Sequence, residues 1–175
     1  MKSRAVFFDR DGTLMEEVHY CSDPAQVKMY AGVPEALRKL KEVGFRTLIV
    51  SNQSGIGRGL FTLDQYRVVE SEVLRQLGDD LVDATYYCPD PPGQKSKSRK
   101  PAPGMVVKAT DDHHIDLSRS FFIGDKESDV ECAHNAGVRA IRVRTRIQRD
   151  MTGSNAEWVV DDVPAAVQLI LNSKS

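Results

Sequence analysis

Two aspartates, Asp9 and Asp11, stand two residues apart in the segment AVFFDRDGTL, directly after an apolar run. Side chains two positions apart in an extended chain point the same way, so both carboxylates can face one substrate. One carboxylate can then attack as a nucleophile while the other transfers the proton. We therefore take Asp9 as the candidate nucleophile and Asp11 as the candidate acid/base. The alternative is a plain turn, because Asp-Gly is a turn signal.

Polar residues also follow the next three apolar runs. They are Ser51 and Asn52, then Arg99 and Lys100 in a basic loop, then Asp125, Lys126 and Asp129. In an open α/β sheet, ligands bind outside the carboxyl ends of the strands, so these residues are expected at one edge. Clustered buried carboxylates are unfavourable unless a cation neutralises them. Mg²⁺ suits such a site, because it binds one or two carboxylates, waters and substrate phosphate.

The elements that must position these residues alternate between strands and helices. Short apolar runs rich in β-branched and aromatic residues predict buried parallel strands over 4–9, 45–51, 84–88, 120–125, 139–144 and 157–160. Amphipathic stretches predict helices over 33–43, 62–77, 104–114, 126–136 and 163–173. The alternation predicts an α/β fold with a doubly wound, mainly parallel sheet.

The segment 88–104 interrupts this alternation. It is rich in Pro, Ser and Lys and has no periodicity, which predicts a linker or mobile loop. It is too short to separate two domains, and no other insertion is long enough to form one. We therefore predict a single domain over 1–175, with no large cap domain and an open active site.

Composition excludes several classes of function. The chain has 175 residues and a formal net charge of -1, so we expect no nucleic-acid partner and no attraction to anionic lipid. No segment approaches the roughly 20 apolar residues of a membrane span, and the start of the chain lacks a secretory signal. Three cysteines form no disulfide framework, which predicts a reduced, cytoplasmic protein. Without an obvious dimerisation stripe, we expect a monomer.

Four motifs carry a resemblance to a known family. They are FFDRDGTL (7–14), VSNQSGIGRG (50–59), SRKPAPGM (98–105) and FIGDKESD (122–129). In this order and spacing they resemble the haloacid dehalogenase-like phosphohydrolase superfamily, and within it the capless histidinol-phosphatase-related group. The resemblance implies a Rossmann-like α/β domain and Mg²⁺-dependent hydrolysis of a small phosphorylated sugar through an aspartyl-phosphate.

The resemblance also implies roles for individual residues. Asp9 matches the nucleophile and Asp11 the acid/base, while Lys100 matches the lysine that stabilises the transferring phosphate. The Mg²⁺ ligands would be Asp9, the backbone carbonyl of Asp11, and Asp125.

Further positions match the family's substrate contacts. Ser51 matches the phosphate-binding hydroxyl, and Arg99 matches the residue that recognises a sugar bisphosphate. The substrate-binding set also takes in two loops and one lysine: Glu17, His19 and Tyr20, then Asn52, Gln53 and Ser54, then Lys126.

The sequence departs from the family at its structural zinc site, which the family often carries in the loop after the third strand. Cys88 remains, but Asp90 stands where the family has histidine, and Ser96 and Ser98 replace two cysteines. A four-coordinate Cys/His site cannot be assembled from one cysteine. We therefore predict that zinc is absent and that this loop is ordered by other means, or less ordered.

Three alternatives remain open. Histidinol phosphate or another small sugar phosphate could be the substrate, because the motifs are shared. A non-catalytic sugar-phosphate binding module belongs to another class, although such a module would not need Asp9, Asp11, Lys100 and Asp125 together. The segment GIGRG could be read as a dinucleotide fingerprint, but it lacks the GxGxxG pattern and does not follow the first strand.

Overall fold

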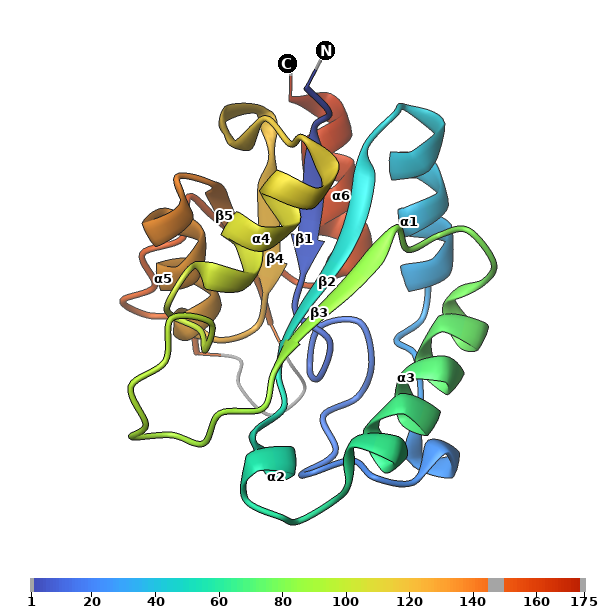
Figure 1. The fold of residues 1–175 in the computed structure, drawn as a ribbon. Helices are drawn as coiled ribbons and strands as arrows, with labels where there is room; N and C mark the ends of the chain where they lie inside the picture. Colours follow the sequence, from blue (N-terminus) through green and yellow to red (C-terminus); the bar gives the residue numbers. More distant parts are fainter. Residues whose placement is uncertain (1, 145–149, 174–175) are drawn as a thin grey trace.

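Six parallel strands form one sheet in the order β3-β2-β1-β4-β5-β6 (Figure 1). The structure is a computed structural model and describes residues 2–144 and 150–173. The strands are β1 Ala5–Phe8, β2 Arg46–Asn52, β3 Ala84–Cys88, β4 Phe121–Gly124, β5 Arg139–Val143 and β6 Trp158–Val160. The predicted Rossmann-like, doubly wound α/β fold is confirmed, and within the described residues no connection folds into a large cap.

Five longer helices match the predicted ranges. They are α1 Val33–Glu42, α3 Leu63–Leu77, α4 Gly104–His113, α5 Glu127–Ala136 and α6 Val163–Asn172. Thr62 caps α3 in a capping box with Gln65, and Gly137 ends α5 in the left-handed conformation. The short α2 Ser54–Gly57 and two 3₁₀ turns, η1 Pro24–Gln26 and η2 Leu117–Arg119, were not expected.

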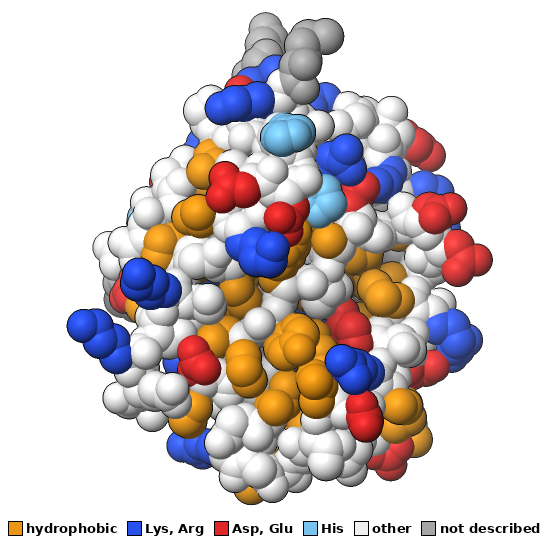
Figure 2. Space-filling view, in the orientation of Figure 1, with side chains coloured by type: hydrophobic (Ala, Val, Ile, Leu, Met, Phe, Trp, Pro, Cys, Tyr) orange, Lys and Arg blue, Asp and Glu red, His pale blue; other side chains and the backbone are white. Residues whose placement is uncertain are grey.

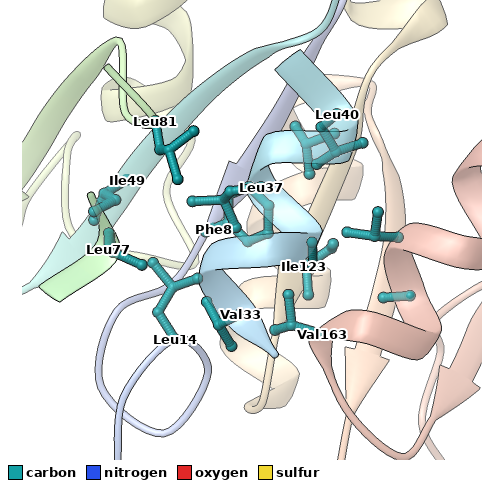
Figure 3. Close-up of a cluster of buried hydrophobic side chains, with 14 of the residues drawn as sticks. Phe8, Leu14, Val33, Leu37, Leu40, Ile49, Leu77, Leu81, Ile123 and Val163 are labelled. Atoms are coloured by element: carbon teal, nitrogen blue, oxygen red, sulfur yellow. The ribbon is translucent and has the colours of Figure 1, made fainter. Parts of the chain in front are cut away.

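The two faces of the sheet carry separate cores because alternate strand residues point to opposite faces. Val6 and Phe8 of β1 join a cluster with side chains of α1, α3 and α6. Figure 3 shows Phe8 of this cluster among Leu37, Leu14 and Ile123. Ala5 and Phe7 of β1 pack on the other face, against α4 and α5. Helices thus cover both faces, which leaves the carboxyl edge of the sheet for a site.

The strand order places two acidic strand ends side by side. The chain runs outward from β1 through β2 to β3, then returns to place β4 on the other side of β1. The backbone N–H of Asp9 donates to the carbonyl of Ile123 at 3.0 Å, so Asp9 and Asp125 leave neighbouring strands together. This point of reversal is where open α/β sheets bind their ligands.

Charged side chains of both signs are interspersed over the face shown in Figure 2, and hydrophobic side chains gather near its middle. This mixture is consistent with the formal net charge of -1. None of the helices in residues 2–144 and 150–173 is both long enough and apolar enough to cross a membrane.

Candidate active site at the carboxyl edge of the sheet

Three buried carboxylates meet at the edge. Asp9 follows β1, Asp125 follows β4, and Asp129 lies in the first turn of α5; each offers an oxygen within 4.8 Å of the others. Burial, together with the charges of Asp9 and Asp129, raises the pKa of Asp125 to about 8. The cluster therefore holds more negative charge than its surroundings favour, as expected for a cation site.

Lys100 supplies part of the missing positive charge. Its Nζ lies 2.7 Å from Asp9 Oδ1 and 2.7 Å from Asp129 Oδ1, and it donates to the carbonyl of Val50 at 2.9 Å. Burial alone would lower the pKa of Lys100, but Asp129 and Asp9 outweigh it and raise that pKa. One ammonium facing three carboxylates leaves a net negative, all-oxygen cluster, and this donor set fits Mg²⁺.

Two glycines allow the carboxylates to approach so closely. Gly12 has φ +86, and a Cβ at this position would lie 2.6 Å from Asp125 Oδ2. A Cβ on Gly124 would lie 2.4 Å from the Cβ of Asp129. Asp11 and Gly12 therefore do form a turn. Because Gly12 has no side chain, this turn leaves room for the carboxylate of Asp125 beside Asp9.

Asp11 does not share the contacts of the acidic cluster, because its carboxylate binds Arg10 and Gln53. Its Oδ2 accepts from Gln53 Nε2 at 2.8 Å, and Arg10 donates to both of its oxygens at 3.0 and 3.1 Å. Gln53 Nε2 also donates to Ser51 Oγ at 2.8 Å. Asp9 and Asp11 thus have different environments, which suits two different chemical roles.

A cavity of about 290 Å³ opens in front of these groups. The predicted site residues that line it are Asp9, Asp11, Glu17, His19, Tyr20, Asn52, Gln53, Ser54, Arg99, Lys100 and Lys126. Ser51 and Asp125 are not among the lining residues: they are 1% and 5% exposed. The wall also contains Val18, Cys21, Gly55, Ser128 and Asp129, which were not predicted as site residues.

The loop 17–20 is tied to the rest of the wall. Glu17 pairs with Lys126 Nζ at 2.9 Å, and Arg58 donates to the hydroxyl of Tyr20 at 2.6 Å. The ring of His19 lies 4.2 Å from that of Tyr20. Burial would lower the pKa of Lys126, but Asp9, Asp125 and Glu17 raise it. The cavity wall therefore carries a charged lysine at Lys126.

The loop after β3 is held by hydrogen bonds of Ser96. Its Oγ accepts from the backbone N–H groups of Ser98 and Arg99 at 3.1 and 2.9 Å, and lies 3.7 Å from Cys88 Sγ. Arg99 Nη1 also donates to the carbonyl of Asp90 at 3.0 Å. One thiol beside hydroxyl groups does not fit the four-coordinate zinc site, so the residues present provide another means of ordering the loop.

Asn52 anchors the same loop from β2. Its side-chain oxygen accepts from the N–H of Lys100 at 3.0 Å, and its Nδ2 donates to the carbonyl of Lys100 at 3.2 Å. We predicted Asn52 as a substrate-binding residue, and it does line the cavity. Its amide is engaged with the backbone that carries Lys100.

Two buried charged residues at the site were given no catalytic, binding or metal role from the sequence. Asp129 was expected only to lie at this edge of the sheet, and it is 1% exposed and contacts Lys100. Arg10 is 1% exposed and pairs with Glu70 as well as Asp11. A signal for Arg10 exists, because Glu70 falls among the core-facing positions of α3, where a charged side chain needs a buried partner.

Comparisons with known proteins agree with this geometry. Residues 98–166 match a family model described as HAD-hydrolase-like. A D-glycero-D-manno-heptose-1,7-bisphosphate 7-phosphatase of Thermosynechococcus vestitus is 36% identical, over 97% of this chain and 96% of the relative. A D-glycero-beta-D-manno-heptose-1,7-bisphosphate 7-phosphatase of Salmonella typhi is also 36% identical, with 94% and 95% covered.

A solved structure shares the whole fold. It is a D,D-heptose 1,7-bisphosphate phosphatase from B. bronchiseptica, complexed with magnesium and phosphate. The two chains superpose with a TM-score of 0.86 at 26% identity, covering 96% of this chain and 98% of that one. Similarity therefore extends over the full length of the relatives, the carboxyl edge of the sheet included.

Proposed function

The chain belongs to the haloacid dehalogenase-like phosphohydrolases, and from this membership we propose that it removes the 7-phosphate of D-glycero-D-manno-heptose 1,7-bisphosphate. The four sequence motifs resemble the phosphatases of this bisphosphate most closely within the superfamily. The product of the reaction would feed the synthesis of nucleotide-activated heptose, a precursor of lipopolysaccharide. The observation that carries the proposal is the contact of Lys100 with Asp9, beside a separately held Asp11.

Asp9 is the nucleophile in this proposal. Its carboxylate oxygen attacks phosphorus, the bond to the sugar oxygen breaks, and an aspartyl-phosphate forms on Asp9. Lys100, already within 2.7 Å of that carboxylate, neutralises charge on the phosphoryl oxygens. Asp11 gives its proton to the departing sugar alkoxide, then takes one from the water that hydrolyses the aspartyl-phosphate.

Asp9, the backbone carbonyl of Asp11, and Asp125 would hold Mg²⁺. When bound, the ion supplies positive charge to the phosphoryl group during transfer. Asp129 supports this site by pairing with Lys100 and by accepting from the N–H of Lys126 at 3.1 Å. Asp129 thereby fixes both lysines relative to the acidic cluster.

Specificity falls to loops, because residues 2–144 and 150–173 form no large cap over the cavity. Arg99 and Lys126 line the wall and can bind a second phosphate, while Glu17, His19, Gln53 and Ser54 offer polar contacts to sugar hydroxyls. Ser51 stays a prediction as the phosphate-binding hydroxyl: it does not line the cavity, and its Oγ accepts from Gln53 at 2.8 Å. We retain the monomeric state, the cytoplasmic location and the absence of zinc as predictions from the sequence.

A substrate panel tests the proposal. Phosphate release is measured with and without Mg²⁺ on both anomers of heptose 1,7-bisphosphate, histidinol phosphate, fructose 1,6-bisphosphate and p-nitrophenyl phosphate. We expect Mg²⁺-dependent activity with the highest kcat/KM on one heptose bisphosphate anomer. Preference for histidinol phosphate, or equal activity across the panel, would contradict the substrate assignment. No release from any ester would contradict the phosphatase itself.

A further inference from the structure

Behind the acid/base runs a chain of buried polar contacts that the proposed reaction does not use. Arg10 donates two hydrogen bonds to Asp11, from Nε at 3.0 Å and from Nη2 at 3.1 Å. Its remaining terminal nitrogen, Nη1, donates to Glu70 Oε2 at 3.0 Å. The other oxygen of Glu70 accepts from Thr85 Oγ1 at 2.8 Å. The contacts therefore run from β3 through α3 to the residue after Asp9.

Burial makes this arrangement a specific one. Arg10 is 1% exposed and ranks among the largest fully buried side chains, and Glu70 is 8% exposed. A buried guanidinium is strongly unfavourable without charged partners, and Arg10 has two. Its guanidinium also lies 5.5 Å from the centre of the Tyr66 ring, within range of a cation–π contact. Each of these contacts limits where the guanidinium can lie.

The geometry of the contact with Asp11 also restricts rotation. A guanidinium that donates to both oxygens of a carboxylate fixes its plane as well as its position. Gln53 adds a third hydrogen bond from another loop, at 2.8 Å. An acid/base must lie within hydrogen-bond reach of the proton it transfers, so the orientation of Asp11 affects the rate directly.

We propose that the chain Thr85–Glu70–Arg10 is a positioning device that holds the carboxylate of Asp11 toward the leaving oxygen of the substrate. Arg10 and Glu70 are positioning residues, since they touch neither substrate nor phosphate in this scheme. The inference rests on the proposed function, because it assumes that Asp11 carries protons for phosphate-ester hydrolysis.

Leaving-group dependence distinguishes positioning from a purely structural role. A sugar alkoxide needs a proton as it departs, whereas p-nitrophenolate leaves readily without one. The ratio kcat/KM reports the steps up to release of the leaving group, so it isolates the proton donation by Asp11. A variant that misplaces Asp11 should therefore be impaired most on the sugar phosphate, and a variant that merely loosens the fold should be impaired equally on both esters.

The test uses Glu70→Gln, which removes a charge and preserves shape at a residue outside the cavity. We expect kcat/KM to fall about tenfold for the best sugar phosphate and less than about threefold for p-nitrophenyl phosphate. The larger loss is smaller than the ~10²–10⁴-fold that acid–base catalysis typically contributes, because Asp11 itself is still present. Thr85→Val, which removes only the outer hydrogen bond, should give a smaller loss with the same preference. If Glu70→Gln fails to fold, Thr85→Val alone provides the test.

The matched control is Asp83→Asn. Asp83 is also a partly buried carboxylate with two cationic partners, Lys41 at 2.8 Å and Arg46 at 3.2 Å. It lies just before β3, at the end of that strand remote from the site. We expect Asp83→Asn to show no leaving-group preference in any loss of activity.

A double-mutant cycle completes the test. In an Asp11→Asn background, Glu70→Gln should change kcat/KM for the sugar phosphate by less than about twofold, because its target is gone. Equal losses on both esters, or full additivity with Asp11→Asn, would overturn the positioning role while the phosphatase assignment stood. A wild-type chain inactive on every ester would overturn both.

Discussion

Arg99 reaches the cavity while its own loop restrains it. The guanidinium donates to the carbonyl of Asp90 at 3.0 Å, and the N–H of Arg99 is held by Ser96 Oγ at 2.9 Å. A side chain restrained in this way loses little conformational freedom when it binds an anion. This restraint is the physical reason to expect Arg99, rather than the exposed Lys95 or Lys97 of the same loop, to recognise a second phosphate.

Replacing Arg99 should therefore change selectivity. Arg99→Ala should lower kcat/KM for the bisphosphate by ~10- to 100-fold, which corresponds to the loss of a charged hydrogen bond of about 1.5–3 kcal/mol. Activity on a sugar monophosphate should fall much less. The measurement is the ratio of the two kcat/KM values, with Lys97→Ala as the control from the same loop. Equal losses on both substrates would contradict the role of Arg99.

Some residues of the site could be predicted from the sequence, and others could not. Asp9, Asp11, Lys100 and Asp125 were predictable because each follows a predicted strand within a recognisable motif. Arg10 was not predictable by the same reasoning, since its partner Glu70 lies 60 positions away. The charged Glu70 among the core-facing positions of α3 indicates a buried partner but does not identify it. Contacts of this kind depend on how a helix packs on the sheet, which local patterns do not specify.

Among the elements, the loop between β3 and α4 is held by hydrogen bonds to the hydroxyl of Ser96. Ser96 Oγ accepts two backbone N–H groups, and the N–H of Gly104 donates to the carbonyl of Lys97 at 2.9 Å to close the loop. Each such hydrogen bond contributes about 1 kcal/mol. The loop therefore has local support, though less than a zinc ion would supply.

Ser96→Ala should disorder this loop, because it removes the acceptor for two N–H groups. We expect kcat/KM for the bisphosphate to fall by ~5-fold or more, as for the loss of about 1–3 kcal/mol of hydrogen bonding. Faster amide hydrogen exchange over 96–104 would accompany the loss. Ser98→Ala is the control, since Ser98 contributes its backbone N–H rather than its hydroxyl. If Ser96→Ala exchanges and reacts like the wild type, the loop is held by something else.

The ends of β2 and β3 opposite the site are joined by Asp83. Its carboxylate accepts from Lys41 Nζ and from the N–H of Thr47, both at 2.8 Å. Burial alone would raise the pKa of Asp83, but these hydrogen bonds keep it below the usual value. A carboxylate with a lowered folded pKa stabilises the fold above its unfolded pKa, and this contribution disappears as the pH falls through the folded pKa.

Asp83→Asn should accordingly lower the free energy of unfolding at pH 7 by about 1 kcal/mol, which is the contribution expected from a partly solvated ion pair. The difference from wild type should shrink below the unfolded pKa of about 3.9. Urea unfolding followed at pH 7 and at lower pH would measure both quantities. A difference that stays constant over this range would show that the charge of Asp83 is not involved.

The elements themselves were largely predictable, and α2 is an exception with a physical cause. The strands and five longer helices follow from apolar periodicity and from caps such as Thr62. Helix α2, with the sequence SGIG, has weak helical propensity. It forms because the chain packs there, with the N–H of Gly57 donating to the carbonyl of Pro89 at 3.2 Å.

At the scale of the whole molecule, the two hydrophobic cores share every central strand. Residues of β1 alternate between the two cores. Disrupting the sheet on one face would therefore also expose the core on the other face. We expect one cooperative unfolding transition, as for most single domains of this size. Fluorescence of the single tryptophan, Trp158, and far-UV circular dichroism should report the same urea midpoint. Two separated midpoints would contradict the single-domain prediction.

The central claim is that the carboxyl edge of the sheet is a phosphatase site with Asp9 as nucleophile. The most direct measurement is Mg²⁺-dependent phosphate release from heptose 1,7-bisphosphate by the wild type and by Asp9→Asn, both checked for folding by circular dichroism. The account predicts a rapid wild-type reaction and a loss of at least ~10³-fold in Asp9→Asn, because no other group can form the covalent intermediate. A folded Asp9→Asn variant that releases phosphate at a rate close to the wild type would contradict it.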